Sequence, residues 1–188
     1  MSFEQLKEEY KICTRCSELC KSRSQVVFGE GNPQARVLFI VEAPGATEDR
    51  EGVPFCGMSG KILSELLAHI GLKREDIFIT NTILCHPQDN RNPTKEEVNN
   101  CISRLDQLID TMKPRAIVTI GNFATERILG KVGITKLRGN IFPLHIAGQE
   151  VKIVPVIHPA SYLYSGRNPE MLKQMKSDFE AIRSCLEP

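Results

Sequence analysis

Four short apolar runs alternate with segments of helical periodicity along the chain, and this order restricts the fold more than any other feature of the sequence. The runs span residues 36–41, 76–80, 116–120 and 152–157. Each is short, continuous and rich in β-branched residues, which is typical of strands buried on both faces. Strands that alternate with helices form parallel sheets. The sequence therefore predicts an α/β fold, a three-layer α/β/α sandwich around a four-stranded, mostly parallel sheet.

The segments between these runs carry the signals of amphipathic helices. Apolar residues recur at helical spacing in residues 62–70 and again in residues 171–186. Thr94 and Glu97 have the spacing of a capping box, which predicts that another helix begins directly after Thr94. Residues 141–151 are expected to form a small antiparallel hairpin. Helices in these positions cover both faces of the predicted sheet.

No repeat, low-complexity segment or linker interrupts the 188 residues. We therefore predict a single domain over residues 1–188, with the N-terminal helix and cysteine-rich loop of residues 1–30 packed on it. The net charge of +1 excludes recognition of nucleic acid by a global field, so a nucleic-acid partner would need a local basic patch. The sequence shows neither a signal peptide nor an apolar run of membrane-spanning length. We expect a soluble, cytoplasmic monomer with no membrane partner.

Polar side chains follow three of the four predicted strands. Glu42 comes directly after the first strand, Asn81 after the second and His158 after the fourth, while Gly121 and Asn122 follow the third. The carboxyl ends of parallel strands meet at one edge of the sheet, where α/β proteins bind their ligands. The sequence therefore predicts a functional site at this edge.

The cysteines form a second candidate site. Cys13 and Cys16 have C-x-x-C spacing, and with Cys85 and Cys101 they supply enough thiolates for a tetrahedral zinc ion or an iron–sulfur cluster. In a reducing compartment, metal ligation or burial is expected in preference to disulfides. Two alternatives stay open: Cys101 is also an apolar residue on the stripe of its helix, and Cys20 could replace one ligand.

These motifs together resemble a family 4 uracil-DNA glycosylase, the iron–sulfur branch of that superfamily. The resemblance runs from about Cys13 to the last helix. It is carried by the four cysteines and by three blocks, which are VVFGEGNPQARVLFIVEAPGATEDREGVPFCGMSGKIL, ITNTILCHPQDNRNPTKEEVNNC and VIHPAS. It implies an α/β/α domain around a four-stranded parallel sheet, in agreement with the fold predicted from the residues.

The resemblance also implies an activity and a cofactor. The activity is hydrolysis of the N-glycosidic bond of flipped-out deoxyuridine in single- and double-stranded DNA, which releases uracil and leaves an abasic site. The cofactor is a structural 4Fe-4S cluster held by Cys13, Cys16, Cys85 and Cys101. Zinc is the alternative metal, because the spacing alone does not distinguish the two.

The resemblance assigns roles at the strand ends. Phe55 stacks on the flipped base. Asn81 donates to O4 and accepts from N3–H of uracil, a pattern that rejects cytosine. His158 donates to O2 as negative charge develops on the leaving uracil.

Four further positions have implied roles around the base. Glu42 and Asn90 position and activate the attacking water. Ala43 contacts uracil through its backbone, and it stands where better-known uracil glycosylases carry a catalytic Asp. Glu48 lines the C5 side of the base and helps to exclude thymine.

DNA contacts are expected outside the base pocket. Leu163 or a neighbouring Tyr is the candidate wedge into the stack that the flipped base leaves. Arg91, Lys136, Arg138 and Arg167 are the candidate phosphate contacts.

The sequence departs from the family pattern at two places, and three rival functions are considered beside the uracil-specific enzyme. Val41 stands where the family usually has Gly, and residues 84–88 (LCHPQ) replace the more usual KCRPP, which removes two positive charges. The rivals are a family 5-like glycosylase of broader base specificity, a non-catalytic DNA-binding domain that keeps the cluster, and a zinc-stabilised α/β hydrolase acting on nucleotides. The joint presence of Glu42, Asn81, Asn90 and His158 favours the uracil-specific enzyme.

Overall fold

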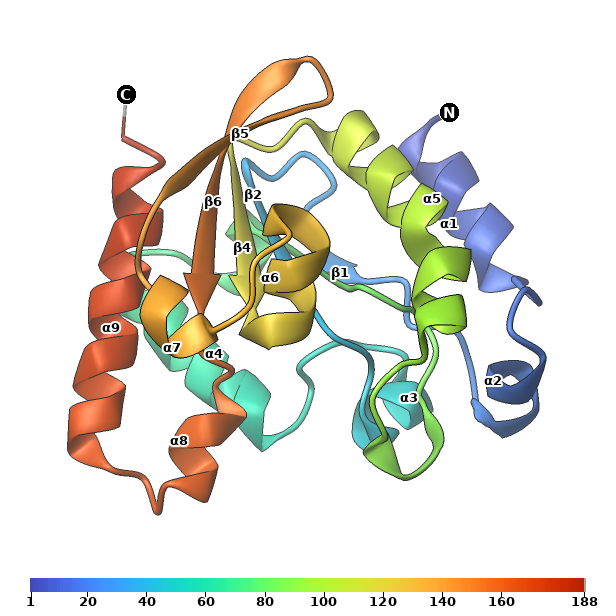
Figure 1. The fold of residues 1–188 in the computed structure, drawn as a ribbon, viewed down its shortest axis with the longest axis horizontal. Coiled ribbons are helices and arrows are strands. Elements are labelled where there is room, and N and C mark those ends of the chain that lie inside the picture. Colours follow the sequence, from blue (N-terminus) through green and yellow to red (C-terminus); the bar gives the residue numbers. More distant parts are fainter. Residues whose placement is uncertain (188) are drawn as a thin grey trace.

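A computed structural model describes residues 1–187, and within them six strands form one sheet in the order β1-β3-β2-β4-β6-β5 (Figure 1). The central strands β3, β2, β4 and β6 are parallel, and β1 and β5 join the two edges antiparallel. The strands are β1 (Glu30–Gly31), β2 (Val37–Val41), β3 (Phe78–Asn81), β4 (Ala116–Ile120), β5 (Phe142–Ile146) and β6 (Gln149–Val156).

The α/β class and the four parallel strands are confirmed, and the sheet is larger than predicted by two edge strands. β5 pairs with β6 and forms the hairpin expected at residues 141–151. β1 has only two residues, so it carries no periodicity that a sequence pattern could detect. Asn81 is the last residue of β3 and does not follow it, which leaves its side chain buried in the sheet edge.

Helices cover both faces of the sheet. They are α1 (Phe3–Lys11), α2 (Ser17–Ser22), α3 (Ala46–Glu51), α4 (Met58–His69), α5 (Lys95–Met112), α6 (Gly121–Leu129), α7 (Ile134–Leu137), α8 (Ala160–Tyr164) and α9 (Pro169–Ser184), with short 3-10 turns at Arg74–Asp76 and Gln88–Asn90. α4 and α9 pack on one face, and α1, α5 and α6 pack on the other (Figure 1).

Strand β2 shows why the apolar runs are continuous. Phe39 and Val41 belong to the core under α4 and α9, whereas Leu38 and Ile40 belong to the core under α1 and α5. Successive side chains point to opposite faces of a sheet, so a strand between two helical layers must be apolar at every position. The carboxyl ends of β2, β3, β4 and β6 consequently emerge together at one edge, with both helical layers beside them.

The N-terminal segment packs on the second core. Leu6 and Tyr10 of α1 are buried against the α5 side of the sheet. The predicted capping box opens α5, because Thr94 Oγ1 accepts from the Glu97 backbone and the Glu97 carboxylate accepts from the Thr94 backbone. This cap determines where the loop after β3 ends and places Cys101 on the second turn of α5, facing the N-terminal loop.

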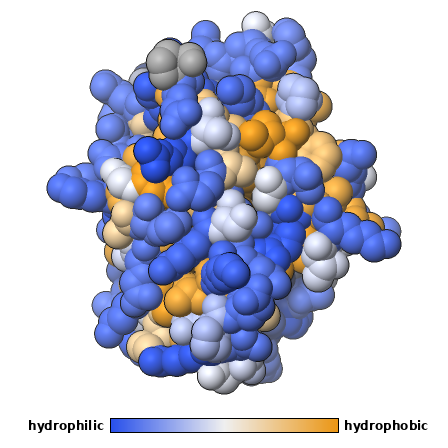
Figure 2. All heavy atoms as spheres, turned by 90° about the vertical axis from the view of Figure 1, so that its left-hand side faces the viewer, coloured by the Kyte–Doolittle hydropathy of each residue, from blue (hydrophilic) through white to orange (hydrophobic). Residues whose placement is uncertain are grey.

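The face that includes α9 is mostly hydrophilic, with apolar residues visible only in small groups (Figure 2). The apolar side chains of α9, such as Met175, Phe179 and Ile182, are turned into the core. No helix within residues 1–187 is long and apolar enough to cross a membrane.

Candidate functional site

A cavity of about 330 Å³ opens at the carboxyl edge of the parallel strands. It brings together most of the catalytic and substrate-binding residues predicted from the sequence. Those that line it are Ala43, Glu48, Phe55, Asn81, Asn90 and His158. Glu42 is the exception, since its neighbours Val41 and Ala43 line the cavity but Glu42 does not. A space of this size suits one flipped nucleobase.

Asn81 is an unsatisfied polar group in the cavity wall. Its side chain is only 3% exposed, and Nδ2 has no hydrogen-bond partner among the described residues. A buried amide donor without a partner costs about 1–3 kcal/mol. Such groups are rare in folded proteins, and they occur where a ligand supplies the missing acceptor. Asn81 is therefore placed to bind a carbonyl oxygen of a molecule in the cavity.

His158 presents a neutral ring with a defined donor. The backbone N–H of Ala160 donates to His158 Nδ1 over 3.1 Å, so this nitrogen carries no proton. Burial lowers the pKa of His158 to about 4, so the ring is neutral at physiological pH. The proton of the neutral ring therefore lies on Nε2. The ring also stacks on Phe55, with 5.3 Å between centroids and 23° between planes.

The low pKa of His158 predicts a pH-dependent loss of stability. The unfolded chain binds a proton at an ordinary pKa of 6.5, whereas the folded protein excludes it down to about pH 4. The stabilisation from the neutral ring is thus complete above pH 6.5 and is lost as the pH falls toward 4, by on the order of 3 kcal/mol. Urea unfolding at neutral pH and near pH 4.5 should show a larger fall for the wild type than for His158→Gln. Equal falls in the two proteins would contradict the assignment.

Phe55 is held in a left-handed backbone conformation, with φ at 53°. A Cβ at position 60 would lie 1.7 Å from the Phe55 carbonyl oxygen, so only Gly lets α4 approach this loop. Arg74 secures the loop from the other side: its Nη2 donates to the Pro54 carbonyl over 2.7 Å and pairs with Glu30 over 2.6 Å. A non-Gly residue at positive φ persists only where its surroundings hold it, and such residues are concentrated at functional sites.

The Glu48 carboxylate lies near Asn90 at the cavity wall. The Glu48 carboxylate lies over Gly45, where a Cβ would meet Glu48 Oε2 at 2.7 Å and Asn90 Oδ1 at 3.8 Å. Asn90 itself has a positive φ of 53°, and its Oδ1 is 3.0 Å from His86 Nε2. Glu42 is half-buried, and desolvation raises the pKa of its carboxyl. The cavity wall thus combines the Asn90 amide with the Glu48 carboxylate, which is a pair of groups that can bind and deprotonate water.

Arg74 and His86 support the site although the sequence predicted no role for either. Arg74 acts on residues about 20 and 44 positions away, so no local pattern signals it. His86 offered only one signal, its position beside Cys85. Tyr164 also lines the cavity and is 89% exposed, whereas the adjacent Leu163 packs against the core.

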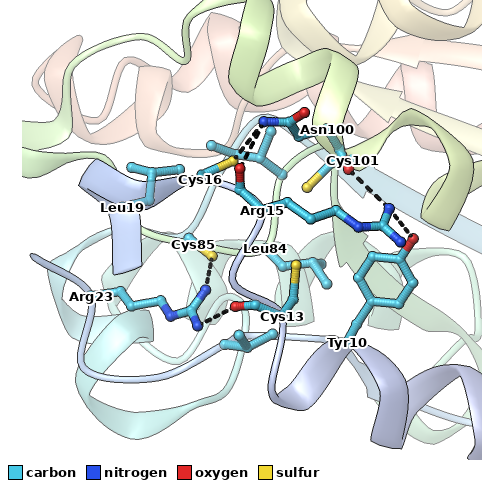
Figure 3. A pocket seen from close by; sticks show the side chains of 12 residues that line it. Tyr10, Cys13, Arg15, Cys16, Leu19, Arg23, Leu84, Cys85, Asn100 and Cys101 are labelled. Carbon is cyan, nitrogen blue, oxygen red and sulfur yellow. Dashed lines mark hydrogen bonds between the residues drawn. The ribbon is translucent and has the colours of Figure 1, made fainter. Parts of the chain in front are cut away.

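The four predicted cysteine ligands line a second cavity, and their sulfur atoms surround a common space (Figure 3). Cys13 and Cys16 come from the loop between α1 and α2, Cys85 from the loop after β3, and Cys101 from α5. Cys20 does not line this cavity. Cys56 is exposed and Cys185 lies in the core under α9, as expected for thiols outside a metal site.

Polar side chains contact the sulfur atoms of this cavity. Arg23 Nη1 donates to Cys85 Sγ over 2.9 Å, and Asn100 Nδ2 donates to Cys16 Sγ over 3.4 Å (Figure 3). Burial raises the pKa of the Cys85 thiol to about 11 in spite of Arg23. Within residues 1–187, no three His, Cys, Asp or Glu side chains come close enough to share one metal ion. The thiols therefore converge on one space without the tight packing that a single tetrahedral ion requires.

Two of the predicted phosphate contacts are engaged in ion pairs within the protein. Arg91 forms two hydrogen bonds to the Glu97 carboxylate, at 2.6 and 2.9 Å. Arg138 pairs with Asp178 over 2.9 Å, and only 16% of its side chain is exposed. Each would have to leave its partner to bind DNA, and would leave a buried carboxylate, Glu97 or Asp178, without its cation. Arg167 and Lys136 are exposed and are the better placed candidates.

The fold and the cavity define a class: an α/β protein with a cavity of about 330 Å³ at the strand ends, lined by an aromatic–imidazole stack and a buried amide. The family model of the uracil DNA glycosylase superfamily matches residues 28–180. The chain therefore belongs to this family. A type-4 uracil-DNA glycosylase of Sulfurisphaera tokodaii is 41% identical over 97% of this chain and 84% of its own length. Another, of Thermotoga maritima, is 40% identical over 97% of this chain and 94% of its own length.

A relative of a second type matches less of the chain. A type-5 uracil-DNA glycosylase of Pyrobaculum aerophilum is 33% identical over 65% of this chain and 67% of its own length. The type-4 relatives thus account for nearly all of the sequence, including the cysteine-rich N-terminal segment.

Proposed function

We propose that this protein is a monofunctional uracil-DNA glycosylase, which hydrolyses the N-glycosidic bond of flipped-out deoxyuridine in DNA and leaves an abasic site. The observation that carries the proposal is the buried, unpartnered Nδ2 of Asn81 in a cavity that also holds Phe55 and His158. The type-4 relatives support it over nearly the full length of the chain. One chain contributes every group named below, so a monomer suffices.

Recognition of uracil follows from the chemistry of the Asn81 amide. Its Nδ2 donates to O4 of uracil, and its Oδ1 accepts from N3–H. Cytosine presents a donor and an acceptor in the opposite positions, so it leaves the buried amide unpaired. Phe55 stacks on the extruded ring, and the backbone of Ala43 forms the adjacent wall.

Release of uracil places negative charge on the base as the C1′–N1 bond breaks. The neutral His158 ring donates from Nε2 to O2, the atom at which this charge develops. Ala160 N–H holds the other ring nitrogen, so the donor tautomer exists before substrate binds. Because the ring starts neutral, its interaction with the oxygen strengthens only as the charge grows, which favours the transition state over the bound substrate.

The attacking water is held at the mouth of the cavity. Asn90 and Glu48 both line the cavity beside Gly45, so together they can bind a water below the sugar. Glu42 is the second candidate for activation of the water, because it stands between the cavity-lining residues Val41 and Ala43, and desolvation raises the pKa of its carboxyl. We also propose that Glu48, which lines the cavity, faces the C5 side of the base and helps to exclude thymine.

A structural 4Fe-4S cluster is the group that fits the cysteine cavity best. Four thiols from three separate segments face one space, which supplies the four thiolates that such a cluster requires. Cys13, Cys16, Cys85 and Cys101 would hold it. The bound cluster supplies a covalent link between the N-terminal loop and the loop after β3. Ala43 packs against the same apolar cluster as Cys85 and Cys101, so this link supports the wall of the base cavity.

DNA binding follows the rim of the cavity. Tyr164 is the best placed residue to fill the stack after base flipping, because it is exposed and lines the cavity. Leu163 would have to leave the core to take this role. We propose that both single- and double-stranded DNA are substrates, since recognition is confined to the extruded base and nearby phosphates.

The test of the proposed function is release of uracil from a labelled single-stranded oligonucleotide that contains one deoxyuridine, with hot alkali to cleave the abasic site. Strands with thymine, hypoxanthine or cytosine at the same position run beside it. Cleavage at uracil alone supports the proposal, and cleavage at hypoxanthine as well indicates the broader type-5 activity. Absence of cleavage by iron-loaded protein would leave a non-catalytic DNA-binding domain.

Replacement of Asn81 by Asp is expected to reverse the choice of base. A carboxylate cannot donate to uracil O4, so kcat/KM for uracil should fall by about 10²-fold or more. The carboxylate accepts from N4–H of cytosine, so slow release of cytosine should appear. Measurement of both bases in single-stranded oligonucleotides checks the prediction. Unchanged preference for uracil would place Asn81 outside the base contacts.

A further inference from the structure

Arg104 is a charged residue with no exposed surface. It lies on α5, one turn after Cys101, and its side chain crosses under the end of β3. Nη1 donates to Thr80 Oγ1 over 3.2 Å, and Nη2 donates to the carbonyl oxygens of Asn81 and Thr82. These three acceptors belong to consecutive residues. Arg104 therefore holds the strand end that carries the base-recognising amide.

The burial of this guanidinium is costly, and no carboxylate among the described residues offsets the cost; Cys101 and Cys85 are nearby groups whose negative charge would favour the charged form. Within residues 1–187, Arg104 forms no ion pair with a carboxylate, and its Nε has no hydrogen-bond partner. Burial lowers the pKa of Arg104 to about 10, which still leaves the group charged at neutral pH. Because burial of the charge costs folding free energy, its presence points to a role for hydrogen bonds that an apolar residue of similar size cannot make.

Residues 80–82, at the end of β3, are held by hydrogen bonds from two sides. Arg104 binds them from one side, and β2 and residue 28 bind them from the other. Thr82 N–H and Thr82 Oγ1 both donate to the Val41 carbonyl, at 2.7 and 2.9 Å. Thr80 Oγ1 donates to the Phe28 carbonyl over 2.7 Å. Without Arg104, the carbonyl oxygen of Asn81 would be a buried acceptor with no described side-chain partner, and the peptide between Asn81 and Thr82 would be held only from the Val41 side. A peptide held from one side can shift, and a shift would move the Asn81 side chain relative to the base.

We infer that Arg104 is a positioning residue for uracil recognition, which grips the carbonyls of Asn81 and Thr82 so that the unpartnered amide of Asn81 faces the base cavity. This inference rests on the proposed function. It predicts that Arg104 acts on catalysis through Asn81 and not through the general stability of the fold. Its loss should therefore weaken the discrimination of uracil from other bases, as well as the rate.

A double-mutant cycle tests this dependence. Arg104→Met keeps the length of the side chain but removes the donors and the charge, and it is expected to lower kcat/KM for deoxyuridine by about 10–100-fold. In an Asn81→Ala background the same change should cost less than about 3-fold, because the residue through which Arg104 acts is gone. Equal losses in the two backgrounds would overturn the inference. Arg104→Lys, which restores the charge and some donors, should recover part of the loss and replaces Arg104→Met if that variant does not fold.

Arg127→Met is the matched control. Arg127 is mostly buried, and it links α6 to α5 through Asp106, but it forms no hydrogen bond to residues 80–82. It should lower stability without changing the ratio of uracil to cytosine release. Iron content is measured for every variant, so that a loss of the cluster is not read as a loss of positioning. A control that reduces discrimination as much as Arg104→Met would overturn the inference.

Hydrogen exchange separates this inference from the proposed function. Amides of residues 78–84 should exchange faster in Arg104→Met than in the wild type or in Arg127→Met, while those of β4 should be unchanged. If the wild-type protein releases no uracil, the proposed function fails, and unchanged exchange at residues 78–84 would show separately that Arg104 does not hold the strand end. Faster exchange combined with a coupled loss of kcat/KM supports the inference.

Discussion

His158→Ala is expected to lower kcat for uracil release by about 10²–10³-fold, with a smaller change in KM. The imidazole donates to an oxygen on which charge appears only in the transition state, so its removal acts mainly on the chemical step. Single-turnover release of uracil from a single-stranded oligonucleotide, with protein in excess, measures that step directly. A rise in KM with unchanged kcat would show that His158 serves only to bind the base.

The pH profile and a control variant sharpen the test. Because burial lowers the pKa of His158 to about 4, its contribution should be constant from neutral pH down to about pH 5. The ratio of wild-type to His158→Ala rates should therefore stay level across this range. His145→Ala removes an exposed histidine of β5, far from the cavity, and should leave both parameters unchanged. A ratio that collapses between pH 7 and 6 would indicate that the charged ring is the active form.

Replacement of any one of the four cavity cysteines by Ser is expected to remove the cluster and to destabilise the whole chain. The wild type should contain about four iron atoms and four sulfides per chain, and each variant much less. A cluster held by these cysteines would link the N-terminal loop to the segment after β3 and close a loop of about 70 residues, so its loss should cost about 4 kcal/mol by the entropy of loop closure. For a chain of this size, the melting temperature should fall by about 10 °C.

Controls come from the remaining cysteines. Cys20→Ser should keep the iron and the melting temperature, because Cys20 does not line the cavity, and Cys56→Ser should do the same because Cys56 is exposed. If Cys20→Ser loses its iron while the Ser variant of one cavity cysteine keeps it, Cys20 is a ligand in place of that cysteine. If anaerobically purified protein contains zinc and no iron or sulfide, the cysteines hold a zinc ion and not a cluster.

Much of the fold could be predicted because its signals are local. Each strand of the parallel sheet is buried by helices on both faces, so the runs around Val37–Val41 and Ala116–Ile120 are continuously apolar and visible in the sequence. The Thr94–Glu97 capping box is local as well, and it opens α5 at the predicted residue. β1 was missed because two residues in a strand have no period.

The site could be predicted only in part. The rule that parallel strands present their carboxyl ends together placed Asn81 and His158 at one edge, and the cavity contains both. Whether a charged side chain is available to bind a phosphate, or is already paired within the protein, does not depend on the local sequence. Arg91 and Arg138 have nothing in their sequence neighbourhood that separates a phosphate ligand from an internal ion pair, and Asp178, the partner of Arg138, lies 40 residues away.

The sequence by itself determined the class of fold, the edge that carries the site and the set of cysteines available to a metal, because periodicity, strand order and residue chemistry are written along the chain. Only the tertiary structure decided which groups lack partners and which are held. It left Asn81 Nδ2 unpaired, defined the tautomer of His158 through Ala160, and buried Arg104 beneath residues 80–82. The physical reason is that burial and hydrogen-bond satisfaction are sums over neighbours in space, and those neighbours come from segments that the chain order keeps apart.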